Sequence, residues 1–453
     1  MDAFAMQALE SPISCLPPEL ILQIFLHAIP GDSPRGRSLV KIVSALCRIC
    51  RHWRRTILAY PFLWRDMIDF DVNNENWIHT LLQRCRSLPV YAKISTPLLH
   101  DYATDSDDPP PLGWKVLLKN LHRVENLALC LSRLNDSCST FAFDQLLVQP
   151  APILRRLHIE ILGVTDWNYE SGVIFAPNLP GSLFAGSCSL RHLSLHNCRF
   201  EPGLARTSFG QLVSLSVIYT KRVSRHTPQK LPSVWLEILS VMPLLEDLEI
   251  SDWIVGSDFN NAVHSTAQHN LANVRLDNLS SLCLTRAIWD CVDILHHLRF
   301  PLSCTLKIEC MSTRPGRDYV AIYSFIQSRI AEMSRTTLMN NISFSVGDSY
   351  GFRFGGYLEK EPLEKVCVSF LLAGAHPQDF HPSFSSWFSD YKHAKEVTMT
   401  LYSDRETDCV AFADIARPFA LVTTLHAGRA FHWPSAALRA LMPEGRGGSS
   451  LLF

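Results

Sequence analysis

A short apolar phrase recurs along the middle of the chain and restricts its fold more than any other feature. Each copy has an apolar residue, two variable residues, a leucine, one variable residue and a further apolar residue. The alternation around the central leucine is typical of a strand with its apolar side chains on one face. One such strand cannot bury that face alone, so the copies must stack on one another. The copies are centred on Leu127, Leu157, Leu193, Leu215, Leu248, Leu282 and Leu306.

The spacing of the copies is irregular. The central leucines lie as few as 22 residues apart (Leu193 to Leu215) and as many as 36 (Leu157 to Leu193). Leucine-rich repeats share this phrase and usually run about 20–29 residues. We therefore expect an α/β fold in which residues 120–440 form an irregular leucine-rich-repeat solenoid with long insertions. Helical patterns occur at 234–239, 287–298 and 319–332, strand patterns at 342–346, 366–370 and 397–401, and insertions at 164–187 and 251–270.

Near the N-terminus, the segment Leu16–Phe25 predicts a short helix that is apolar on two faces. Prolines at its start suit the first helical turn, and Glu19 meets the positive end of the helix dipole. A short helix of this kind is stable only when it is buried on both sides, one against its own domain and one against a partner. The two faces are formed by residues four apart, Leu20 with Ile24 and Ile21 with Phe25.

A second helical pattern covers residues 38–60. It contains Cys47 and Cys50, which form a Cys-x-x-Cys pair without a second pair at zinc-finger spacing. We interpret both cysteines as packing residues. The arginines of the same segment are interpreted as the solvated side of an amphipathic helix, because the stems of long basic side chains cover apolar surface.

Three blocks in residues 11–66 resemble the F-box: Leu-Pro-Pro-Glu-Leu at 16–20, the Trp53-containing stretch at 46–54, and Pro-Phe-Leu-Trp at 61–64. They agree with that family in type, order and approximate spacing, although the loop at 30–37 is longer than usual. The resemblance implies a three-helix module that binds the adaptor subunit of SCF-type cullin–RING ubiquitin ligases. By motif position, the implied adaptor-binding residues are Leu16, Pro17, Pro18, Leu20, Ile21, Ile24, Phe25, Leu46, Cys50, Trp53, Leu63 and Trp64, the last five serving either the interface or the core of the module.

The later part resembles the repeat region of F-box and leucine-rich-repeat proteins of mushroom-forming fungi, as in the phrases at 82–90 and 297–302. This resemblance implies a substrate-recognition subunit that binds the adaptor and, through it, cullin. The solenoid would bind a target protein. Such a subunit is not an enzyme, has no cofactor, and is expected in the cytoplasm, the nucleus or both. The alternative is a leucine-rich-repeat scaffold without a ligase role, in which the first helices cap the solenoid.

The residues that flank the leucines point out of the predicted core and are the candidates for target binding. Their charges are of both signs, which favours a specific protein surface over a polyanion. The other interpretation is that they are solvated polar positions without a partner. The candidates are His158, Glu160, His192, His196, Asp247, Glu249, Lys307 and Glu309.

Composition limits the remaining classes of function. The 453 residues carry 42 Lys and Arg against 43 Asp and Glu. The chain therefore lacks the basic excess that is typical of nucleic-acid-binding proteins. We find no signal peptide, membrane span, phosphate loop or nucleophile elbow. Among the 18 histidines, His376 and His381 have a spacing that would suit a metal, but no Cys or carboxylate partner lies at a matching offset, so no metal site is predicted. The 14 cysteines are therefore predicted to be thiols. Residues 1–10 and 441–453 are expected to be loose tails, and 67–119 a connecting region with a helix at 77–85, a strand at 90–94 and an acidic Pro-rich loop.

Overall fold

The computed structural model describes much of the chain up to residue 311 and shorter stretches beyond it. The chain divides into two compact units, one of Met1–Thr165 with Ser182–Leu190 and one of Asp166–Gly181 with Arg191–Phe453. Both contain helices and parallel strands, so the predicted α/β class is confirmed. The described residues are 16–28, 37–71, 74–95, 112–131, 145, 149–161, 189–198, 209–219, 232–252, 273–311, 325, 328, 332, 341–347, 351–358, 365–373, 396–401 and 424–427.

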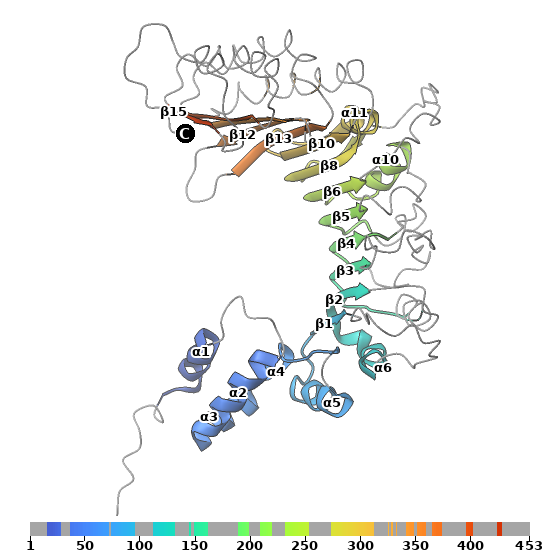
Figure 1. Ribbon diagram of the computed structural model, residues 1–453. Helices are drawn as coiled ribbons and strands as arrows, with labels where there is room; N and C mark the ends of the chain where they lie inside the picture. The colour runs from blue at the N-terminus through green and yellow to red at the C-terminus, as the bar shows by residue number, and fades with distance from the viewer. Residues whose placement is uncertain are drawn as a thin grey trace, which may run out of the picture. The chain divides into compact units, whose positions relative to one another are not determined.

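The first unit begins with helices. The prediction of a single helix at 38–60 is wrong, because one helix ends at Ile49 and a second begins at Arg51, on either side of Cys50. The Cys50 backbone is extended (φ −155°, ψ 170°), and its Sγ accepts a hydrogen bond from the N–H of Trp53 at 3.4 Å. A cap of this kind starts a new helix without interrupting the apolar periodicity. The helices are α1 (Pro18–Ala28), α2 (Arg37–Ile49), α3 (Arg51–Ala59), α4 (Pro61–Arg65), α5 (Glu75–Arg84) and α6 (Leu112–Asn120), followed by the 3-10 turn η2 (Leu121–Arg123) (Figure 1).

Aromatic side chains join α1 and α4 to α3. The rings of Phe25 and Trp53 meet edge to face with centroids 5.0 Å apart, which joins α1 to α3. The indole N–H of Trp64 on α4 donates to the carbonyl of Ile57 on α3 at 3.0 Å. Phe25, Ile57 and Ile21 are fully buried. These contacts place one face of α1 in the core and leave its other face outside.

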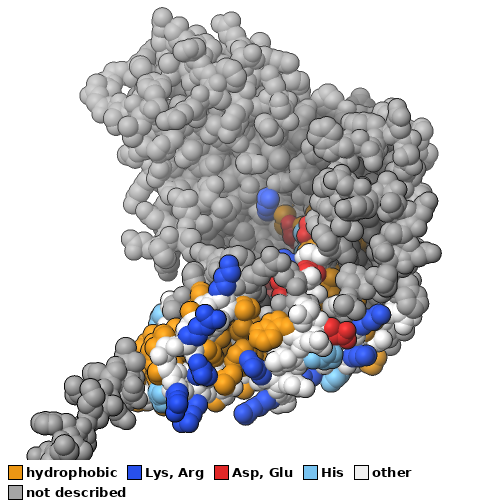
Figure 2. Space-filling view, turned by 60° about the horizontal axis from the view of Figure 1, so that its bottom comes forward, with side chains coloured by type: hydrophobic (Ala, Val, Ile, Leu, Met, Phe, Trp, Pro, Cys, Tyr) orange, Lys and Arg blue, Asp and Glu red, His pale blue; other side chains and the backbone are white. Residues whose placement is uncertain are grey.

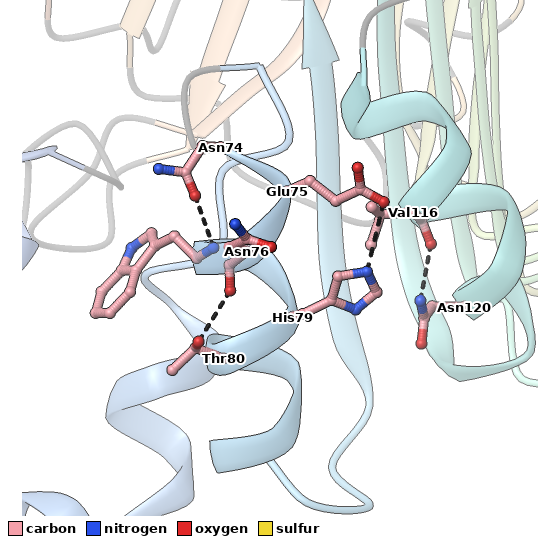
Figure 3. A network of polar contacts seen from close by, with 8 residues as sticks. Asn74, Glu75, Asn76, His79, Thr80, Val116 and Asn120 are labelled. Carbon is pink, nitrogen blue, oxygen red and sulfur yellow. Dashed lines mark hydrogen bonds and ion pairs between the residues drawn. The ribbon is translucent and has the colours of Figure 1, made fainter.

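Asparagine side chains form local hydrogen bonds near the start of α5 and near the end of α6. Asn74 accepts from the N–H of Trp77 at 2.8 Å and begins α5, and the Asn120 amide donates to the carbonyl of Val116 near the end of α6 (Figure 3). At the start of α6, a Cβ on Gly113 would overlap the carbonyl of Phe70. This close backbone approach requires glycine, since any side chain would push α6 away.

Three parallel strands complete the first unit. The leucines of the recurring phrase pair across β2 and β3, Leu127 with Leu157, and Ala92 of β1 continues this row. The same side chains are buried, whereas their neighbours along each strand are more exposed. The strands are β1 (Val90–Ser95), β2 (Val124–Leu131) and β3 (Arg156–Ile161).

In the second unit, five further parallel strands stack in chain order. The central leucines lie in register from Leu193 to Leu306, each no more than 1% exposed. Every copy of the phrase is therefore a strand, as predicted, and the alternate residues form a second buried row. The strands are β4 (His192–His196), β5 (Ser214–Tyr219), β6 (Asp247–Asp252), β8 (Ser281–Ala287) and β10 (Thr305–Met311).

Helices α10 (Pro232–Ser240) and α11 (Ile288–His297) lie beside these strands, with the short strands β7 (Val274–Arg275) and β9 (Leu298–Arg299) (Figure 1). Both helices were predicted from periodicity, and Trp235 and Ile294 bury their apolar faces. Of the helix predicted at 319–332, residues 325, 328 and 332 are described and are helical. Nearly all of the two predicted insertions lies outside the described residues.

Beyond β10 the strand order no longer follows the chain. The order is β10-β13-β12-β11-β14-β15, with β12 antiparallel to both neighbours. The three strands predicted in this region, at 342–346, 366–370 and 397–401, are confirmed as β11, β13 and β14. Strands β12 and β15 were not predicted, and the three glycines of β12 are typical of turns. A hairpin from β11 to β12 reverses the chain, so β13 pairs with β10. The strands are β11 (Asn341–Gly347), β12 (Gly351–Leu358), β13 (Lys365–Ala373), β14 (Glu396–Leu401) and β15 (Thr424–Ala427).

The leucine rows predict the effect of one substitution. Leu248→Ala should lower the free energy of unfolding by about 2–5 kcal/mol, because strands stacked on both sides cannot collapse onto the hole. Urea denaturation measures the change. The control is Asp247→Ala, the adjacent exposed residue of β6, which should change stability by no more than about 0.5 kcal/mol. Equal losses in both variants would contradict the burial of this row.

Candidate functional site

Large apolar side chains are exposed on the first four helices. Leu20 is 45% and Ile24 42% exposed on the outer face of α1. Figure 2 shows hydrophobic side chains between Lys and Arg side chains on this part of the surface. In the described residues, only Ile153 and Leu244 elsewhere are comparably exposed large hydrophobic residues. We call the exposed set on the helices the apolar docking set: Leu20, Ile24, Ile49, Leu58 and Phe62.

The structure divides the residues that the resemblance assigned to adaptor binding. Pro17, Pro18, Leu20 and Ile24 are exposed and available to a partner, whereas Leu16, Leu46 and Cys50 are half-buried. The other five are buried among the described residues, which for Trp53, Leu63 and Trp64 is the core role that the sequence left open. These five are Ile21, Phe25, Trp53, Leu63 and Trp64.

Three members of the docking set were not predicted. Ile49 ends α2, directly before the break at Cys50. Because that break re-aims the chain, a single helical wheel drawn over residues 38–60 assigns the wrong face to Leu58. The four-residue spacing of Leu58 and Phe62 was the one available signal.

The charge around the docking set is positive. Glu19 is the only carboxylate within α1 to α4. The Arg54 guanidinium donates to the carbonyl of Cys47 at 2.9 Å, and that of Arg65 lies 5.3 Å from the centre of the Phe62 ring. The basic residues of these helices are Arg37, Lys41, Arg48, Arg51, Arg54, Arg55 and Arg65.

The outward residues of the second unit form polar rows across the strands. One row runs from Ser194 through Ser216 and Glu249 to Cys283 and Lys307. Ser216 Oγ donates to Glu249 Oε2 at 2.7 Å, which holds the carboxylate across two strands. Such a row can present both signs of charge to a protein partner.

Of the predicted target-binding residues in the second unit, His192, Asp247, Glu249 and Lys307 fall on these outward positions. His192 and Asp247 share one row, each paired with Ser214 of β5, and Glu249 and Lys307 share the next. Glu309 pairs with Thr285, and its side chain lies outside the described residues. His196 pairs with Ile218 of β5.

His158 and Glu160 belong to β3 in the first unit. Their side chains are 34% and 33% exposed, and Nε2 of the histidine lies 3.7 Å from Oε2 of the glutamate. Ser95 of β1 and Cys130 of β2 lie in register with Glu160 on the same side of the sheet.

Four of the described thiols lack the environment of a nucleophile. Burial raises the pKa of Cys85 to about 11 and raises the pKa of Cys198 further. Burial is also the largest cause of the raised pKa of Cys47 and Cys130. Because the thiolate is the reactive form, these four cysteines are poor candidates for nucleophilic catalysis.

The comparisons with known proteins do not assign the chain to a family. No protein-family model matches the sequence, and a search of curated proteins finds no match either. Within the described helices, none combines the length and the apolar character needed to span a bilayer.

The division into core and surface can be measured. Trp53→Ala should destabilise the protein by about 3–5 kcal/mol, since it empties the contact with Phe25. Ile24→Ala, on the exposed face of α1, should change the free energy of unfolding by no more than about 0.5 kcal/mol. Thermal or urea unfolding of both variants checks this. A large loss for Ile24→Ala would show that α1 packs the other way round.

Proposed function

We propose that this protein is the substrate-recognition subunit of an SCF-type ubiquitin ligase. The F-box-like helices bind the adaptor, and a leucine-rich-repeat-like stack of strands binds the target protein. The observation that carries the proposal is α1, which buries Ile21 and Phe25 and exposes Leu20 and Ile24. A helix that exposes large apolar residues opposite a packed face is typical of a protein-docking element.

The docking set has the composition of an interface core. The set consists of four aliphatic side chains and one phenylalanine, each between 42% and 57% exposed. Arginine residues of the same helices form its rim. Protein interfaces combine a desolvated apolar centre with a polar rim, and a few anchors supply most of the binding energy. Leu20 and Ile24, one turn apart on α1, are the proposed anchors.

The strand stack supports the second half of the proposal. Leucine rows make a rigid sheet, and the outward rows display side chains such as Asp247, Glu249 and Lys307 at fixed spacing. A receptor needs no catalytic group. It accelerates ubiquitin transfer by holding a target lysine close to the charged thioester, which replaces a bimolecular encounter.

One observation favours the alternative of a protein-binding scaffold without a ligase role. The helices and strands β1 to β3 form one compact unit. The ends of a stacked sheet need covering, and helices are a common cover. In this alternative, the helices serve the stack, and the docking set has no adaptor partner.

Adaptor binding separates the two proposals. The full chain is co-expressed with the ligase adaptor and analysed by size-exclusion chromatography. Wild type should form a 1:1 complex, and Leu20→Glu with Ile24→Glu should abolish it, because two carboxylates would be buried without partners. Leu16→Ala with Pro17→Ala should also weaken the complex by altering the entry to α1.

Matched controls distinguish loss of the interface from loss of the fold. Ile153→Glu and Leu244→Glu place the same charge on side chains that are 37% and 41% exposed and do not belong to α1 to α4. Both should keep the complex. A folded wild-type protein that ignores the adaptor would favour the scaffold, as would a complex that tolerates the Leu20 and Ile24 substitutions.

The arginine rim predicts how the complex responds to salt. We expect the partner surface to be acidic, so the association rate should fall about tenfold between low and high ionic strength. Arg51→Glu with Arg55→Glu should remove most of this dependence. Stopped-flow or surface-plasmon measurements check it, with Arg299→Glu, an exposed residue of β9, as the control. A rate that does not depend on salt would contradict an electrostatic rim.

A further inference from the structure

Three side chains of different chemistry converge on the polar side of β2 and β3. The Cys130 thiol, the His158 imidazole and the Glu160 carboxylate each offer a ligand atom, and these atoms all lie within 4.8 Å of one another. We propose that Cys130, His158 and Glu160 bind a Zn²⁺-class transition-metal ion. The proposal does not depend on adaptor binding, because none of the three residues belongs to the docking helices.

The register of the sheet builds this triangle. Cys130 pairs with Glu160 across β2 and β3, and Ala128 pairs with His158. His158 and Glu160 are two residues apart on one strand, so their side chains point to the same face. Neighbouring strands are about 4.8 Å apart, a spacing that brings facing side chains within reach of a single ion.

The three donors select the class of metal. Zn²⁺ accepts thiolate, imidazole and carboxylate ligands, whereas Mg²⁺ and Ca²⁺ prefer sites made of oxygen alone. Zinc–ligand bonds of about 2.0–2.3 Å place tetrahedral ligands roughly 3.3–3.8 Å apart. The His158–Glu160 separation of 3.7 Å is already in that range. The thiol needs only a small side-chain movement to complete the set.

Three protein ligands leave one position of a tetrahedron open. The side chains of His158 and Glu160 are 34% and 33% exposed, so an ion can enter from the polar face. Cys130, only 9% exposed, forms the floor of the site. The fourth position would take water or a donor group from a bound protein, the arrangement found where zinc is accessible to a ligand.

Groups on β1 lie next to Cys130 and help to fix its position in the site. The N–H of Ser95, in register with Cys130, donates to both carboxylate oxygens of Asp71 at 2.7 Å. This contact holds the end of β1 beside the site. Lys93 is on the same side of the sheet. Burial and the Glu160 carboxylate raise the pKa of the Cys130 thiol, and the charge of Lys93 lowers it in part.

The competing explanation is an ordinary ion pair between His158 and Glu160. The chain contains a matched example in α5, where His79 Nε2 lies 3.6 Å from Glu75 Oε1 (Figure 3). Among the described residues, a thiol joins a histidine and a carboxylate at metal-binding distances in the cluster of Cys130, His158 and Glu160. The His79 pair therefore provides the control for what a histidine–glutamate contact does without a thiolate.

Cobalt tests the site directly, because a thiolate bound to Co²⁺ gives a ligand-to-metal charge-transfer band in the near ultraviolet. The full-length protein is stripped of metal with a chelator and titrated with Co²⁺, and bound Co²⁺ is then displaced with Zn²⁺. Wild type should show one equivalent that Cys130→Ser lacks. Glu160→Gln should weaken this equivalent by at least roughly 10–100-fold, the loss typical of even an outer-shell change.

The controls are His79→Ala and Cys283→Ser, which should retain the wild-type titration. Circular dichroism of each metal-free variant verifies folding, and if Cys130→Ser does not fold, Glu160→Gln decides the question. The proposal is overturned if wild type binds no metal. It is also overturned if Cys130→Ser, or Glu160→Gln when that variant decides, matches wild type in stoichiometry and affinity.

Discussion

Burial of the leucine rows is the interaction on which the rest of the structure depends. Strands β4, β5, β6, β8 and β10 each pair their central leucine with that of the next strand, from Leu193 to Leu306, and every one of these side chains is at most 1% exposed. Each contributes about 1.5–3 kcal/mol when buried, which no isolated strand can obtain. The outward residues acquire fixed positions as a consequence, because strand side chains alternate.

The N-terminal helices are stabilised by a different kind of core. Their core is aromatic and small, with Phe25 against Trp53, and a module of this size has little apolar material to spare. It nevertheless leaves Leu20 and Ile24 exposed. Exposed side chains of this kind lower solubility without stabilising the fold, so we interpret them as partner contacts. The arginines around them would steer an acidic partner.

Much of the strand stack was predictable, because aligning the central leucines of the recurring phrase gives the register between neighbouring strands. Aligning Leu127 with Leu157 places Cys130 opposite Glu160, three residues beyond each leucine, so the triangle with His158 was within reach of the sequence and was missed. The break at Cys50 was not predictable, since a cysteine cap leaves the helical periodicity intact. Strand β12 could not be predicted from its sequence, because its glycines are typical of turns. The antiparallel pairing of β12 with β13 then changes the strand order, because it depends on a contact that the sequence pattern does not indicate.

Amide hydrogen exchange on the full chain tests the stacking most directly. Leu248→Ala should accelerate exchange in residues 214–219, 247–252 and 281–287 together, because each strand is held by its neighbours. The helices at 18–28 and 51–59 should keep their wild-type rates. Faster exchange confined to residues 247–252 would contradict the account, since it would mean that each strand is stable without the leucine rows beside it.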